Sequence, residues 1–159
     1  VNISSPNTPN LRALHARENF EPLFSALNIT RIKLDFTKPV FIKLSPDESK
    51  EVIADIIQAV REYKFDGVIA SNTTINHSGL TEQDSNRRLG GLSGKPLFKK
   101  SNALLASIHE NDHDLFKIGV GGVFSPIDFN KKLELGASLV QIYTSFIYEG
   151  PGIVSKLLT

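Results

Sequence analysis

The sequence predicts an α/β protein built on a parallel β-sheet, and two observations lead to this prediction. Short, nearly continuous apolar runs recur along the chain, as expected for strands that are covered on both faces. Longer segments separate these runs, and they carry apolar residues three and four positions apart, as amphipathic helices do. Because the two patterns alternate, we expect a parallel sheet with helices packed against it.

Five apolar runs are predicted strands. The first opens the chain with Val1 and Ile3 and ends in a rigid loop that contains Ser-Pro and Asn-Thr-Pro. The other four runs are VFIKLS, GVIAS, KIGVG and SLVQIY. Together the five predicted strands cover residues 1–4, 40–45, 67–71, 117–121 and 138–143.

Helices are predicted between the strands. Ser45-Pro46-Asp47-Glu48 has the pattern of a capping box with Pro at the first helical position, and apolar residues then recur from Val52 to Val60. Ser125-Pro126-Ile127-Asp128 repeats this pattern, with Gly136 as the C-terminal stop. Weaker patterns predict further helices over residues 17–27, 98–110 and 151–159.

The element order fits either an open doubly wound sheet or a (β/α)₈ barrel. A barrel typically needs about 250 residues, so this alternative requires three further βα units before Val1. The sequence contains no Met and starts inside an apolar run. We therefore expect the chain to be a fragment, with no second domain in residues 1–159.

Composition narrows the functional classes. Apolar residues make up 40% of the chain, charged residues make up 22%, and the net charge is +1, so no nucleic-acid-binding surface is indicated. The absence of Cys excludes disulfides, thiolate zinc sites and Cys nucleophiles within this sequence. No apolar run is long enough to span a bilayer.

Lys43 is the most informative single residue, because it lies inside an apolar strand. Burying an ammonium group is costly unless an anion meets it. Strand alternation puts Phe41, Lys43 and Ser45 on one face. Lys43 therefore either faces a bound anion or electron-rich cofactor, or extends into solvent at a sheet edge.

Two glycine-rich loops, GGLSGKPL (90–97) and GVGG (119–122), have the composition of phosphate-binding loops. Neither matches a common nucleotide-binding motif, because Leu89, Pro96 and Phe124 occupy positions where those motifs need other residues. Their place after predicted strands suggests one phosphate held between them. Turn formation alone is the alternative explanation.

The segment HENDHD (109–114) is the one cluster that resembles a metal site. Its two His residues are four positions apart and could bind zinc. The segment falls where a predicted helix ends, and the metalloprotease order of ligands is absent. We therefore favour a solvated loop and assign no metal ligands.

Six blocks of sequence, in their order and spacing, closely resemble the C-terminal part of class 2 dihydroorotate dehydrogenases, the quinone-linked flavoenzymes of pyrimidine synthesis. The blocks are NISSPNTP, FIKLSPD, ASNTT, GGLSGKPL, IGVGGV and GASLVQIYTS. The resemblance implies a (β/α)₈ barrel that binds FMN at the carboxyl ends of its strands. Residues 1–159 would then be about the last five βα units of a single FMN-binding domain, and the fragment alone would be inactive.

The resemblance also implies residue roles. Ser5 matches the catalytic base, which is Cys in class 1 relatives. The matches to substrate-binding positions are Asn2, Asn7, Asn72 and Thr73. The matches to FMN-binding positions are Asn2, Lys43, Ser71, Gly94, Gly122, Tyr143 and Thr144, with Lys43 beside the flavin ring and the glycines around the phosphate.

The implied activity is oxidation of dihydroorotate to orotate, with quinone as electron acceptor. Quinone would bind through N-terminal helices that this chain lacks. The parent would associate peripherally with the bacterial cell membrane on its cytoplasmic face, or with the mitochondrial inner membrane in a eukaryote. The alternatives are another FMN barrel oxidoreductase and a non-catalytic barrel that binds a phosphate ligand.

Overall fold

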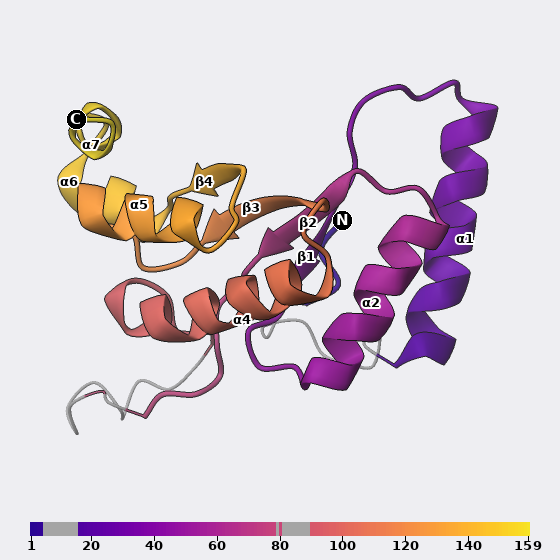
Figure 1. Ribbon diagram of the computed structural model, residues 1–159, viewed down its shortest axis with the longest axis horizontal. Coiled ribbons are helices and arrows are strands. Elements are labelled where there is room, and N and C mark those ends of the chain that lie inside the picture. Colours follow the sequence, from indigo (N-terminus) through magenta and orange to yellow (C-terminus); the bar gives the residue numbers. More distant parts are fainter. Residues whose placement is uncertain (5–15, 79, 81–89) are drawn as a thin grey trace.

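The computed structural model describes residues 1–4, 16–78, 80 and 90–159. Four strands form one sheet in which every neighbouring pair is parallel and the spatial order follows the sequence (Figure 1). They are β1 (Phe41–Leu44), β2 (Gly67–Ala70), β3 (Phe116–Val120) and β4 (Leu139–Gln141). The predicted parallel sheet and four of the five predicted strands are therefore confirmed.

The predicted strand over residues 1–4 is wrong in extent, because it forms only a parallel bridge between Asn2 and Lys43. Lys43 N donates to Val1 O at 2.9 Å, which pairs the two segments. Ser4 N donates to Asn2 Oδ1 and Ser4 Oγ donates to Lys43 O, at 3.2 Å and 2.8 Å. These side-chain bonds end the ladder at Ser4.

The helices differ from the prediction mainly in their bounds. They are α1 (Arg17–Lys33), α2 (Lys50–Glu62), α4 (Phe98–Asn111), α5 (Pro126–Glu134), α6 (Thr144–Glu149) and α7 (Ile153–Leu157), with the 3₁₀ turn η2 (Lys95–Leu97) before α4. The α1 helix continues beyond the predicted end at residue 27. The helix predicted over residues 151–159 is confirmed as the shorter α7, whereas α6 before it was not predicted. Gly150 ends α6 at φ 72° and Pro151 follows.

The helix after β1 begins later than predicted. Its N-cap is Ser49, whose hydroxyl accepts from Val52 N, so the predicted capping box at Ser45 is wrong. The Ser45 hydroxyl instead accepts from Asp47 N at 3.1 Å, which forms a turn. The prediction for α5 is confirmed, because the Ser125 hydroxyl accepts from Asp128 N.

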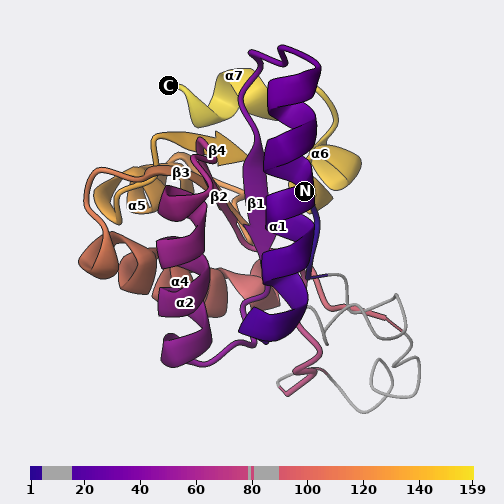
Figure 2. The same ribbon diagram turned by 90° about the vertical axis from the view of Figure 1, so that its right-hand side faces the viewer.

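The core lies between the sheet and the helices on one of its faces. The strand residues buried there are Ile42, Leu44, Val68 and Ala70. Figures 1 and 2 show α1, α2 and α4 side by side over this face. Phe41, Lys43 and Ile69 point to the opposite face and are only partly buried, as the alternation of β1 predicts.

The last strand departs from the expected burial on both faces. Leu139 is 55% exposed, because β4 has a neighbour, β3, on only one side in the described sheet.

Within the described ranges, no helix combines the length and the apolar character that crossing a membrane requires.

Candidate active site

A pocket lies at the carboxyl ends of the four strands, where the loops that follow them meet. Parallel pairing brings these ends to one edge, which is where ligands bind in α/β proteins. Strands β1, β3 and β4, the loop after β2 and the loop before α4 contribute lining residues. The lining residues that the sequence predicted are Lys43, Ser71, Asn72, Thr73, Gly94, Gly122, Tyr143 and Thr144.

Lys43 brings the positive charge to this pocket. It pairs with Ile69 of β2 and its side chain lies on the face opposite the helices. Burial lowers the pKa of the Lys43 ammonium. In the part of the chain that the structure describes, no carboxylate forms a salt bridge with it. The pocket can therefore offer a half-buried cation to an anionic or electron-rich ligand.

Asn2, Ser4 and Asn72 form a polar network beside Lys43. The Asn72 amide nitrogen donates to Asn2 Oδ1 and to Ser4 Oγ, both at 3.1 Å. Asn72 Oδ1 accepts from Thr73 N at 2.8 Å. Asn2 is outside the set of residues that line the pocket, but this network joins it to the lining residue Asn72. Two amides and a hydroxyl are therefore held beside the Lys43 backbone, and Asn72 lines the same pocket as Lys43.

The glycine loops form the other end of the pocket. Gly94 and Gly122 have φ of 76° and 75°, a conformation that favours glycine. A Cβ on Gly122 would lie 2.8 Å from Phe98 N at the start of α4, so only glycine permits this close approach. The backbone here can meet an anion at the positive end of a helix of 14 residues.

Two groups of site residues differ from the rest. The first group was predicted but lies outside the described residues, and the second lines the pocket but was not predicted. Ser5 and Asn7 belong to the first group, so their roles stay predictions. Ser93 and Gln141 line the pocket and were missed. Ser93 Oγ accepts from Thr144 Oγ1 at 3.0 Å, which links two loops. Gln141 carried the same signal as Lys43, a polar residue within an apolar strand.

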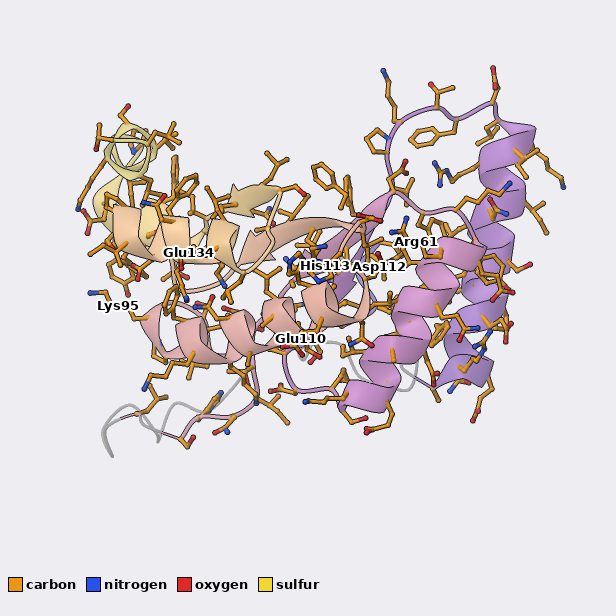
Figure 3. All side chains as sticks on the ribbon, viewed as in Figure 1. Arg61, Lys95, Glu110, Asp112, His113 and Glu134 are labelled. Atoms are coloured by element: carbon orange, nitrogen blue, oxygen red, sulfur yellow. The ribbon has the colours of Figure 1, made fainter. Side chains whose placement is uncertain are left out.

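The segment 109–114 has a structural role in the fold. Arg61 donates to both carboxylate oxygens of Asp112, at 2.6 and 2.7 Å, and Figure 3 shows this pair between α2 and the end of α4. The rings of His109 and His113 pack with their centroids 4.0 Å apart. Among the residues described here, no group of three potential metal ligands occurs.

A second lysine, Lys132, is fully buried behind the pocket. Its ammonium donates to Ser101 Oγ at 2.6 Å and to Val120 O at 3.4 Å, and it lies 5.5 Å from the centre of the Phe98 ring. Burial lowers the pKa of Lys132 to about 8. Ser101 Oγ also lies 3.2 Å from Gly121 O. Lys132 of α5 therefore supports the glycine loop through α4 and β3.

A parallel sheet with its pocket at the strand ends places the molecule among the α/β ligand-binding proteins of the barrel and doubly wound types. The family model for dihydroorotate dehydrogenase matches residues 1–159. The chain belongs to the dihydroorotate dehydrogenase family, so its sheet is part of a (β/α) barrel. Members of this family depend on a flavin.

Two relatives are named dihydroorotate dehydrogenase (quinone). The one from Christiangramia forsetii is 46% identical over 158 residues, and the one from Sinorhizobium fredii is 44% identical over 163 residues. A solved structure of the Eimeria tenella enzyme in complex with ferulenol superposes with a TM-score of 0.90 at 31% identity. The comparison covers 98–99% of this chain but 45–46% of each of these proteins, so the chain spans about half their length.

Lys132 gives a prediction about stability and pH. Because its pKa is 10.5 in ordinary surroundings and about 8 when folded, the unfolded chain binds more protons between these values and stability rises with pH there. We expect Lys132→Met to be stabilised relative to the parent at pH 7. This difference in unfolding free energy should shrink by about 1 kcal/mol between about pH 7 and 9.

The measurement is urea unfolding of the whole protein at both pH values, with Lys99→Met as an exposed control. The control should show no such change with pH. A difference between Lys132→Met and the parent that stays constant would mean that Lys132 keeps its ordinary affinity for protons.

Proposed function

We propose that this chain is part of an enzyme that oxidises dihydroorotate to orotate in pyrimidine synthesis, with FMN as cofactor and quinone as final electron acceptor. The observation that carries the proposal is the convergence of Lys43, the Asn72 and Thr73 side chains and the glycine loops on one pocket. Membership of the dihydroorotate dehydrogenase family and the quinone-type names of the relatives support it.

The residues present fit FMN at both ends of the pocket. Gly94, Gly122 and Thr144 would hold the phosphate, because positive-φ glycines leave room for an anion beside the first turn of α4. Lys43 would face the flavin ring, where its charge favours the reduced, anionic form. The other proposed FMN contacts are Asn2, Ser71 and Tyr143. When bound, FMN supplies the hydride acceptor.

The other residues have roles on the substrate. Dihydroorotate loses a proton from C5 and a hydride from C6, and the C5–C6 bond becomes a double bond. Ser5 would take the C5 proton as general base, while its own hydroxyl proton leaves through a hydrogen bond to a neighbouring group or water. Asn2, Asn7, Asn72 and Thr73 would hold the carboxylate and the ring amides, since their side chains supply both donors and acceptors. The two electrons would then pass to quinone, which takes up two protons and becomes quinol.

Quinone use is proposed from the names of the relatives, and membrane association from the resemblance of the sequence to the quinone-linked class. We propose that the quinone binds outside residues 1–159 and that the whole protein associates peripherally with a membrane. In a bacterium this would be the cytoplasmic face of the cell membrane, and in a eukaryote the mitochondrial inner membrane.

Anaerobic mixing of the whole protein with dihydroorotate tests the function. We expect the flavin absorbance to bleach, whereas a barrel that only binds a phosphate ligand would keep its yellow colour. Ser5→Ala should slow bleaching by about 10²-fold or more, because a positioned base contributes about 10²–10⁴-fold.

The variant Ser5→Cys is the matched control for this experiment. A thiol can also accept the proton, so this variant should bleach faster than Ser5→Ala while both keep bound flavin. Equal rates for the two variants would argue against proton transfer at Ser5. An unbleached parent would contradict the proposed reaction itself.

Lys43→Met tests the role of the half-buried charge. Methionine keeps the volume of the stem but removes the ammonium, so the flavin should become harder to reduce. Flavin binding should also weaken, because a charge-assisted hydrogen bond contributes about 1.5–3 kcal/mol. Redox titration and flavin release measure the two effects, and exposed Lys50→Met is the control. An unchanged reduction potential would show that Lys43 extends into solvent.

A further inference from the structure

Asp47, in the turn between β1 and α2, binds the loop that follows β2. Its Oδ1 accepts from Thr74 Oγ1 and from Lys100 Nζ, each at 2.5 Å, and its Oδ2 accepts from Ile75 N at 2.9 Å. The side chain of Asp47 is only 10% exposed. The carboxylate thus joins the β1–α2 turn, the loop after β2 and α4.

Thr74 is the centre of this contact. It is 3% exposed, and its hydroxyl accepts from Asn76 N at 3.0 Å while it donates to Asp47. Its backbone pairs with Leu92 in both directions, at 3.1 and 2.7 Å. The Asp47 carboxylate therefore fixes the rotamer of a residue that organises both the loop after β2 and the glycine loop at residues 90–97.

Asn72 and Thr73 lie between two anchors from the β1 side. Asn72 N donates to Leu44 O at 2.8 Å, at the end of β1. Two residues after Thr73, Ile75 N donates to Asp47. The segment that presents Asn72 and Thr73 to the pocket is therefore held at one end by a strand and at the other end by a carboxylate.

We propose that Asp47 is a positioning residue for the substrate-binding loop. This inference rests on the proposed function, in which Asn72 and Thr73 hold dihydroorotate. Asp47 does not line the pocket, and its bonds with Thr74 and Ile75 transmit its effect to the loop. Asp47 holds Thr74 through the side chain, whereas the Thr74 backbone holds the glycine loop, so the effect of Asp47 should fall more on substrate affinity than on flavin binding.

The charge state of Asp47 suits this role. Burial alone raises the pKa of this carboxyl, but the hydrogen bonds from Lys100 and Thr74 hold the pKa below its usual value. The Asp47 carboxyl is therefore ionised at neutral pH, and both of its oxygens accept hydrogen bonds. An amide in its place has one acceptor oxygen and one NH₂ group, so it satisfies either Ile75 N or the Thr74–Lys100 pair, but not both.

The experiment is Asp47→Asn in the flavin-loaded whole protein. We expect the dissociation constant of orotate, followed by the flavin spectrum, and the KM for dihydroorotate to rise about tenfold. The flavin content and the KM for quinone should change little, whereas the melting temperature should fall somewhat, because a buried donor loses its acceptor.

Matched variants separate the parts of this contact. Lys100→Met leaves the bonds from Asp47 to Thr74 and Ile75 in place, so orotate affinity should stay within about threefold of the parent. Thr74→Ser keeps the hydroxyl and should resemble the parent, whereas Thr74→Val removes it and should weaken orotate binding. The two Thr74 variants decide the question if Asp47→Asn does not fold.

Unchanged orotate affinity in both Asp47→Asn and Thr74→Val would overturn the positioning role. So would a loss of flavin and of thermal stability with no change in orotate affinity, because that pattern belongs to a purely structural contact. The parent is measured first. If it binds no orotate, the proposed function fails, and this outcome is distinct from a parent that binds orotate and a variant that binds it equally well.

Discussion

Parallel pairing of β1 with β2 aligns Leu44 with Ala70, and the geometry of the pocket depends on this register. The pairing continues from Ala70 to Gly119 and from Gly119 to Val140, so four loops leave the sheet at one edge. A slip of one residue in β1 would move Lys43 from the pocket face into the helix-covered core. The apolar residues on either side, Ile42 and Leu44, hold the register by filling that core.

Three lysines in the described residues are buried to different extents and by different partners. Lys117 is almost fully buried, and its ammonium donates to three backbone carbonyls, those of Asp112, His113 and Leu115. The Lys132 ammonium donates to one hydroxyl and one carbonyl and lies over an aromatic ring. Lys43 has the pocket in front of it. A lysine with many carbonyl partners supports the fold, whereas one that faces a pocket is available to a ligand.

The sequence best predicts those features of the fold that depend on interactions between residues close together in the chain. Ser125 caps α5 as expected, because its bond to Asp128 N lies within one turn of helix. Ser45 begins the same sequence pattern, but Asp47 binds Thr74 and Lys100, which are distant in sequence. The helix therefore has its N-cap later, at Ser49. In the site, Lys43 could be found because it breaks an apolar run. Ser93 could not be singled out, because in the sequence it resembles any polar turn residue. Only the fold brings Thr144 within hydrogen-bond distance of it.

The two anchors on the loop after β2 have a consequence for protein engineering. Because Leu44 O and the Asp47 carboxylate hold that loop from the β1 side, residues 45–49 and 71–76 form one unit although 21 residues separate them. A graft of the second segment from a relative with a different substrate would lose its supports unless the first segment were transferred with it. Substrate range in this barrel is therefore expected to change by the exchange of paired loops, not of single ones.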